Sequence, residues 1–149
     1  MVYNLLPSKI GLPDKLKEKA LEVDNEIKRS IDLFFEKRER IYQGYFWEIN
    51  EGRFPIKVML INQLCYSELD KTFIFAQLDK DNIVKISARR IDGKINLPAL
   101  LKKLIENFKD SNGGGHIKAA GCYFPIEHYD EFKKRIRGLK ESELKEFFV

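Results

Sequence analysis

Three consecutive glycines, Gly113, Gly114 and Gly115, are followed directly by His116. Residues without a side chain let backbone N–H groups approach an anion closely, and glycine takes positive φ angles at little steric cost. The imidazole can donate a hydrogen bond to a phosphate oxygen, and it titrates near neutral pH. We predict that these residues form a loop that binds a phosphate group. A flexible turn beside an unrelated histidine is the alternative.

A strand that ends at an arginine supplies the second candidate for phosphate chemistry. Alternation along residues 83–90 places Ser87 and Arg89 on one face of that strand. A guanidinium can bind phosphate through two hydrogen bonds, which lysine cannot do. An ordinary surface ion pair is the alternative for Arg89. Arg90 is one residue off the alternation, and we predict a surface position for it.

The chain contains few residues that could catalyse a reaction or hold a metal ion. It has two histidines, His116 and His128, and two cysteines, Cys65 and Cys122. They lack the paired spacing that gives a metal convergent ligands, and Cys65 has no activating neighbour visible in the sequence. We therefore predict no catalytic residue, no metal ligand and no cofactor in this chain.

Length and composition fit a single compact domain. The chain has 149 residues, of which 44% are apolar and 34% charged, and this suits one globular core. The formal net charge of +4 is compatible with a polyanionic ligand, although many soluble domains carry as much. Two distant cysteines and the lack of an apolar leader predict a reduced, cytoplasmic setting. No apolar run is long enough to cross a bilayer.

An amphipathic helix is predicted to begin near Pro13, because apolar residues then recur at steps of three or four. We interpret its charged opposite face as a solvated surface rather than a basic binding ridge. Residues 1–12 are predicted to form an extended lead-in. The apolar positions of the helix are Leu16, Ala20, Val23, Ile27, Ile31 and Phe34.

Two hairpins are predicted next. The first joins an aromatic strand, residues 41–49, to an apolar strand, residues 56–61, through turn residues 50–53. The aromatic side chains are expected to fill a core, and a stacking platform for bases is the alternative. The second hairpin joins residues 72–77 to residues 83–89.

The last third of the chain predicts two helices and a short strand between them. Asn96 is a suitable N-cap for a helix over residues 97–108. Pro125 ends a strand over residues 122–124, and a closing helix over residues 126–137 follows. The predicted fold class is α/β, a mixed sheet of about five strands with flanking helices, preceded by a long N-terminal helix. Side chains predicted to point inward from the closing helix are Ile126, Tyr129, Phe132 and Ile136.

The order of these pieces resembles one known family. The strand end Ser87-Ala88-Arg89, the helix start at Asn96, the Gly-Gly-Gly-His run and an Ala-Ala-Gly strand entry at Ala119 occur as in the DHH-associated C-terminal domain of the DHH phosphoesterase superfamily. That superfamily includes RecJ-type exonucleases, oligoribonucleases and cyclic-dinucleotide phosphodiesterases. The resemblance covers roughly residues 56–138.

The resemblance implies a division of labour between two domains. In the family, a larger N-terminal domain carries the Asp-His-His motif and the metal-binding residues, and the C-terminal domain grips the substrate. This chain has no Asp-His-His motif, so manganese or magnesium is expected only in a missing DHH domain. The implied layout is a lead-in and connecting helix at residues 1–40, a substrate-binding domain at residues 41–140 and a tail at residues 141–149.

The resemblance also assigns roles to residues of this chain. Arg89 matches the arginine that relatives use against substrate phosphate, and His116 matches the histidine that contacts the nucleotide or phosphate. Asn112 stands where several relatives have a further glycine. The implied binding set is Ser87, Arg89, Asn96, Gly113, Gly114, Gly115 and His116.

Three functions follow as alternatives. The first is the substrate-binding part of a DHH-type exonuclease or phosphodiesterase, not catalytic alone, which binds single-stranded DNA, RNA or short oligonucleotides. The second is a free-standing, non-enzymatic module that binds nucleic acid or assembles with a replication or repair protein. The third is kinship with alanyl-tRNA synthetase relatives, and it is the weakest because the histidine and the Ala-Ala-Gly run are closer to the phosphoesterase branch. No membrane partner is expected.

Overall fold

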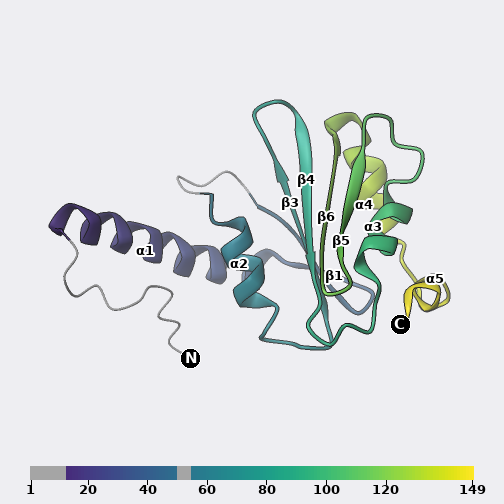
Figure 1. Ribbon diagram of the computed structural model, residues 1–149, viewed down its shortest axis with the longest axis horizontal. Coiled ribbons are helices and arrows are strands. Elements are labelled where there is room, and N and C mark those ends of the chain that lie inside the picture. Colours follow the sequence, from purple (N-terminus) through teal and green to yellow (C-terminus); the bar gives the residue numbers. More distant parts are fainter. Residues whose placement is uncertain (1–12, 50–54) are drawn as a thin grey trace.

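The computed structural model describes residues 13–49 and 55–149. The predicted lead-in and the predicted turn at residues 50–53 lie outside these ranges. A six-stranded mixed sheet forms the centre of the protein, in the order β1-β2-β3-β4-β6-β5 (Figure 1). The predicted α/β class with a mixed sheet is confirmed. The strands are β1 (Glu39–Ile41), β2 (Gly44–Glu48), β3 (Thr72–Leu78), β4 (Ile83–Arg89), β5 (Asn112–His116) and β6 (Ala119–Pro125).

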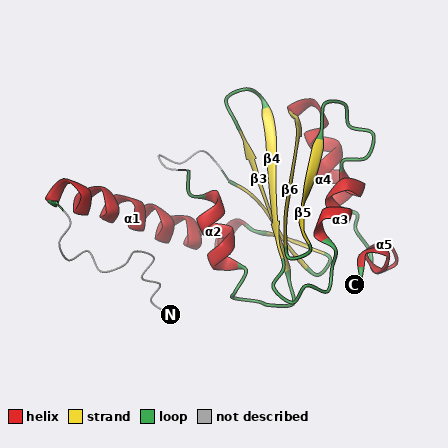
Figure 2. Ribbon diagram, viewed as in Figure 1, coloured by secondary structure: helices red, strands yellow, loops and turns green. Residues whose placement is uncertain are grey.

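Helices pack on both faces of the sheet (Figure 2). The face that carries α1 (Asp14–Lys37) and α2 (Lys57–Leu64) is called the α2 side. The opposite face, the α3 side, carries α3 (Leu97–Leu104) and α4 (Tyr129–Arg137). The short helix α5 (Glu141–Leu144) and two 3-10 turns, at Ile126–His128 and Lys145–Phe147, complete the described chain. None of the described helices is both long enough and apolar enough to cross a membrane.

The predicted N-terminal helix is present as α1, but only part of its apolar stripe is buried. Ile27 and Phe34 are buried, whereas Leu16 is 52% exposed. The N-terminal part of α1 extends beyond the sheet (Figure 1), so it has no core to face.

The aromatic strand fills the core, as expected, and does not offer a platform for bases. Tyr45 and Trp47 are each 7% exposed and pack around the ring of Phe34, with ring centroids 6.1 and 5.7 Å away. Phe73 and Phe75 of β3 complete this cluster at 5.9 and 5.5 Å. The aromatic residues therefore anchor α1 to the α2 side of the sheet.

The predicted strand over residues 56–61 is wrong, because these residues begin helix α2. β2 and β3 are parallel neighbours, and two parallel strands need a crossover connection rather than a hairpin turn. Helix α2 provides that crossover. The first hairpin instead joins β1 to β2 through a turn at Gln43, which has a φ of 55°.

The rest of the predicted order is confirmed with small shifts. β3 and β4 form the second hairpin, and α3 begins after Asn96, whose Oδ1 accepts a hydrogen bond from the N–H of Ala99 at 3.1 Å. The closing helix begins as a 3-10 turn and becomes α4. The inward position predicted for Ile126 is wrong, since this side chain is 43% exposed.

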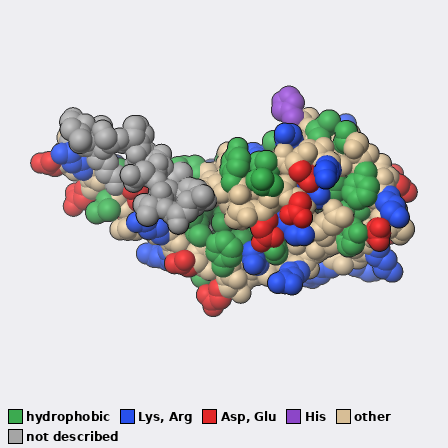
Figure 3. Space-filling view, turned by 90° about the horizontal axis from the view of Figure 1, so that it is seen from below, with side chains coloured by type: hydrophobic (Ala, Val, Ile, Leu, Met, Phe, Trp, Pro, Cys, Tyr) green, Lys and Arg blue, Asp and Glu red, His purple; other side chains and the backbone are tan. Residues whose placement is uncertain are grey.

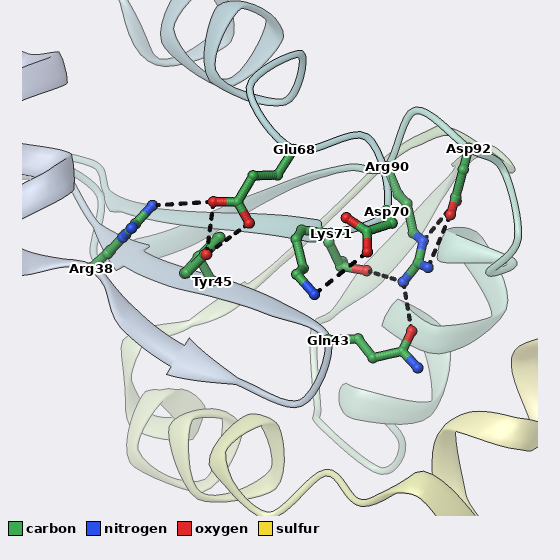
Figure 4. A network of polar contacts seen from close by, with 9 residues as sticks. Arg38, Gln43, Tyr45, Glu68, Asp70, Lys71, Arg90 and Asp92 are labelled. Atoms are coloured by element: carbon green, nitrogen blue, oxygen red, sulfur yellow. Dashed lines mark hydrogen bonds and ion pairs between the residues drawn. The ribbon is translucent and has the colours of Figure 1, made fainter.

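Arg90 is buried, contrary to its predicted surface position. Its side chain is 4% exposed, and it donates from Nε and Nη2 to the two carboxylate oxygens of Asp92 at 2.7 and 3.1 Å (Figure 4). Nη1 donates to Gln43 at 3.0 Å and to Thr72 at 3.3 Å. Because these partners come from three separate segments, Arg90 ties the end of β4 to the β1–β2 turn and the start of β3.

Candidate functional site

One part of the sheet is left uncovered by the described helices. On the α2 side, α1 and α2 pack over β2 and β3, and the buried cluster there contains no residue of β4, β6 or β5. Helix α2 reaches β4 through the polar contacts of Lys57 and Asn62. Helices α3 and α4 pack on the other side of those three strands. The α2 side of β4, β6 and β5 is therefore accessible, and we call it the open face.

Strand register gives the open face a regular layout. Residues directly opposite one another in antiparallel strands lie on the same face. Alternate residues of β4, β6 and β5 therefore form three rows across the sheet, and the confirmed alternation places Ser87 and Arg89 in adjacent rows. The rows are Lys85, Tyr123 and Asn112; then Ser87, Gly121 and Gly114; then Arg89, Ala119 and His116.

The glycine triplet is not a loop. Residues 112–116 form the edge strand β5 and pair with β6, so the predicted loop with a nest of amides is wrong. Ladder pairing with an Ala-Ala-Gly strand holds the glycine backbone extended and engages the backbone groups that point toward β6, so these groups do not converge into a nest. Gly115 has a φ of 132°, which side-chain-bearing residues rarely adopt, so its glycine is a backbone requirement.

Gly113 and Gly114 differ in what a side chain would meet. A Cβ at Gly113 would lie 2.7 Å from the Cβ of Cys122, whereas a Cβ at Gly114 would have nothing within 4 Å. The fold therefore requires glycine at 113 and not at 114. Together with Gly121 in the same row, Gly114 leaves the backbone as the floor of a shallow hollow of about 550 Å³. Its lining residues include Lys85, Asn112 and Tyr123.

Arg89 stands at one end of the open face and is held from the side by α2. Its Nε donates to Oδ1 of Asn62 at 2.8 Å, and its Nη1 donates to the carbonyl of Ala88 at 2.8 Å. Partial burial lowers the pKa of the guanidinium, although arginine stays charged at any physiological pH. No described carboxylate pairs with Arg89, and Nη2 has no acceptor within the described segments. The guanidinium of Arg89 is therefore held in place, and no described carboxylate offsets its charge.

His116 is exposed in the same row as Arg89. Two strand spacings of about 4.8 Å each separate their Cα atoms by roughly 10 Å. Ala119, with its small side chain, lies between them.

Asn96 does not share this face. It precedes α3, which packs on the α3 side, and its Oδ1 is engaged in capping that helix. The structure thus brings together Ser87, Arg89, Gly114 and His116 and leaves Asn96 apart. Its binding role remains a prediction.

A second cation lies near the other end of β4. Lys57, the first residue of α2, places its Nζ 3.4 Å from the carbonyl oxygen of Lys85. Burial lowers the pKa of Lys57, and the nearby charges of Lys85 and Arg89 lower it further. Lys85 itself pairs with Asp79 at 3.0 Å. Sequence reasoning missed both Lys57 and Asn62. Lys57 lay in residues 56–61, which were interpreted as a strand, and Asn62 follows that range and belongs to no motif.

Neither cysteine supplies a nucleophile. Burial raises the pKa of the Cys122 thiol to about 12 and also raises the pKa of Cys65, so both stay protonated at neutral pH. Across residues 13–49 and 55–149, no three His, Cys, Asp or Glu side chains gather closely enough to hold a metal ion. The described residues therefore do not fit a metal centre.

Overall charge does not mark the binding surface. In the view of Figure 3, Lys and Arg side chains lie interspersed with Asp and Glu side chains. Several basic side chains near the end of α4 are paired, such as Lys133 with Asp130 at 3.1 Å and Arg137 with Glu39 at 2.8 Å. Lys57 and Arg89 of the open face differ from these paired cations, because neither has an acidic partner among the described residues.

Comparison with known protein families finds one match. The model of the DHHA1 domain matches residues 58–142, a range that includes α2 except its first residue, β3 to β6, α3 and α4. No curated protein sequence matches the chain.

Several solved structures share the fold. The pGpG-specific phosphodiesterase PggH from Vibrio cholerae has a TM-score of 0.59 and 17% identity, and the match covers 85% of this chain and 42% of PggH. CDC45 from Entamoeba histolytica has a TM-score of 0.59 and 14% identity, with 80% of this chain and 28% of CDC45 covered. The C-Ala domain from Aquifex aeolicus alanyl-tRNA synthetase has a TM-score of 0.51 and 16% identity, with 68% of this chain and 99% of that domain covered. The chain thus spans less than half of PggH, and at these identities the likeness concerns the fold alone.

Proposed function

The chain belongs to the DHHA1 domain family, and from this premise we propose that its open face binds the phosphate groups of single-stranded nucleic acid or short oligonucleotides. The observation that carries the proposal is the middle row of the face. Gly114 has no side chain, although the fold has space for one at this position. Gly114 forms part of the floor of the hollow, and Arg89 and His116 lie in the adjacent row of the face. The hollow is lined by Lys85, Asn112 and Tyr123, in the row on one side of Gly114. The guanidinium of Arg89, which has no acidic partner among the described residues, stands in the row on the other side, and such a group suits a phosphate oxygen.

In this proposal each residue of the face has a defined task. Arg89 donates two hydrogen bonds to phosphate oxygens, and Asn62 orients its guanidinium through Nε. His116 donates a further hydrogen bond from the far side of Ala119. The hydroxyl of Ser87 and the glycine backbone form the floor. The face binds and orients a substrate, and hydrolysis is the task of a DHH catalytic domain that carries its own metal ions.

A second candidate function uses the same face without hydrolysis. The C-Ala domain is covered over 99% of its length by this fold, and it is part of an alanyl-tRNA synthetase. A DHHA1 domain can on this view act as a nucleic-acid-binding or assembly module in a replication or repair complex. The first candidate and the nucleic-acid-binding form of the second require the open face to bind phosphate, so one experiment tests what they share. Absence of binding would favour the assembly module.

Replacing Arg89 or His116 with alanine is expected to weaken binding of a short single-stranded oligonucleotide by about 1–3 kcal/mol each, the scale of a charge-assisted hydrogen bond. The double variant should lose less than the sum of the two, because both side chains serve one ligand. Fluorescence anisotropy measures the dissociation constants, and wild-type affinity should fall as salt rises. Thermal midpoints should stay nearly unchanged, since neither side chain is in the core.

The matched control is Lys133→Ala, which removes a cation from α4 on the α3 side. We expect this variant to bind like the wild type. If Lys133→Ala weakens binding while Arg89→Ala and His116→Ala do not, the ligand binds at the basic end of α4 instead. Affinity that does not respond to salt would also count against phosphate recognition.

A further inference from the structure

The open face has cations at both ends of β4, and their environments differ. At one end, Arg89 contacts Asn62 of α2 and has no acidic partner among the described residues. At the other end, Lys57 is the cation without an acidic partner in the part of the chain that the structure describes, whereas the charge of Lys85 is offset by Asp79. Lys57 is also half-buried, so its position is restricted.

The same helix fixes both cations relative to the strand. Lys57 at the start of α2 reaches the backbone of Lys85, and Asn62 in the same helix holds Arg89. Helix α2 therefore runs alongside β4 and forms one wall of the open face. Arg89 lies four positions along the strand from Lys85, a distance of about 13 Å between Cα atoms. Asn62 lies five positions along the helix from Lys57, a rise of about 7.5 Å.

These Cα separations exceed the size of one phosphate group. We therefore expect that a mononucleotide whose phosphate lies at Arg89 does not also place this phosphate at Lys57. A chain of phosphodiesters can reach both cations, because its charged groups repeat along an extended backbone. The hollow at Gly121 and Gly114 lies in the row between the two ends, so that backbone has space to cross the sheet.

We propose that Lys57 binds a second phosphate group of a ligand whose first phosphate lies at Arg89, so that the open face favours oligonucleotides over mononucleotides. This inference rests on the proposed function and adds a residue and a selectivity to it. The buried stem of Lys57 also supports the assignment, since an ammonium partly removed from water gains more from a phosphate than one in bulk solvent.

Isothermal titration of the wild type with thymidine 5′-monophosphate and with the 5′-phosphorylated thymidine dinucleotide tests this inference. The wild type should bind the dinucleotide more tightly. Lys57→Met, which keeps the length of the apolar stem, should raise the dissociation constant of the dinucleotide roughly tenfold, as for loss of a charge-assisted contact. It should leave the mononucleotide within about twofold. The salt slope for the dinucleotide should fall by about 0.7, the value for one lost phosphate contact on a single strand.

The matched control is Lys102→Met, which removes an exposed lysine from α3 on the opposite side of the sheet. It should not change either dissociation constant, and both variants should keep the wild-type thermal midpoint. Equal affinity of the wild type for the two ligands overturns the selectivity, and an equal effect of Lys57→Met on both ligands overturns the second phosphate position. Failure of the wild type to bind either ligand overturns the proposed function itself, which is a different result.

Discussion

Replacing Arg90 with methionine is expected to lower the free energy of unfolding by about 3–5 kcal/mol, the cost of removing one partner from a buried ion pair. The guanidinium of Arg90 contacts both carboxylate oxygens of Asp92. The variant leaves that carboxylate 16% exposed and without its cation. It also removes the hydrogen bonds that Nη1 of Arg90 donates to Gln43 and Thr72. Urea unfolding at neutral pH measures the difference.

The matched control is Arg137→Met. Arg137 also contacts both carboxylate oxygens of its partner, Glu39, at 2.8 Å, but both side chains are about half exposed, at 51% and 45%. Exposed pairs contribute roughly 0–1 kcal/mol, so this variant should unfold nearly like the wild type. Equal destabilisation by the two variants would contradict the special role of burial at Arg90.

The Arg90 effect should also depend on pH. The hydrogen bond from Arg90 lowers the pKa of Asp92 below its ordinary value of 3.8. A carboxyl group with a lowered folded-state pKa stabilises the fold above its unfolded pKa, and this stabilisation is lost as the pH falls through the lower folded value. The difference between wild type and Arg90→Met should therefore be complete at neutral pH and shrink below about pH 4. A difference that stays constant down to pH 2 would show that lost packing, rather than the ion pair, causes the effect.

Replacing Gly114 with leucine is expected to weaken oligonucleotide binding by about thirtyfold or more, or about 2 kcal/mol. The new side chain would fill the hollow in the row next to Arg89 and His116 and keep a phosphate away from both. Stability should stay the same or rise slightly, because a Cβ at Gly114 meets nothing within 4 Å and glycine in a strand interior is unfavourable. Anisotropy and thermal unfolding measure the two quantities separately.

Gly113→Ala is the matched control on the neighbouring residue. Its Cβ would lie 2.7 Å from the Cβ of Cys122, so the strand or Cys122 must shift, at a cost of about 1–3 kcal/mol in stability. The two variants should thus have opposite profiles, one losing binding and the other losing stability. If Gly114→Leu binds as tightly as the wild type, the hollow is not part of the binding site.

Local patterns in the sequence were sufficient for most elements of the fold. Apolar residues at steps of three or four predicted α1, α3 and α4, and alternation predicted that Ser87 and Arg89 share a face of β4. These patterns succeed because a helix or a strand repeats its side-chain directions within the segment itself. The capping role of Asn96 is equally local, and it too was predicted from residue type and position.

Long-range pairing decided what these patterns could not. The apolar run at residues 56–61 is too short for periodicity to separate strand from helix, and the parallel pairing of β2 with β3 requires a helical crossover there. The glycine triplet has the composition of a loop and became strand β5 because β6 supplies a partner in register. Arg90 has the residue type of a surface position and is buried because Asp92, Gln43 and Thr72 converge on it from separate segments.

The sequence by itself therefore determined the family, the helices α1, α3 and α4, and the identity of the candidate phosphate ligands Arg89 and His116. The tertiary structure alone placed these two residues in one row, set Gly114 apart from its glycine neighbours, and brought Lys57 and Asn62 of α2 beside β4. The physical reason is one of range. Residue type and periodicity act within a few positions of the chain, whereas a binding face is made by the order and register of strands that are distant in sequence.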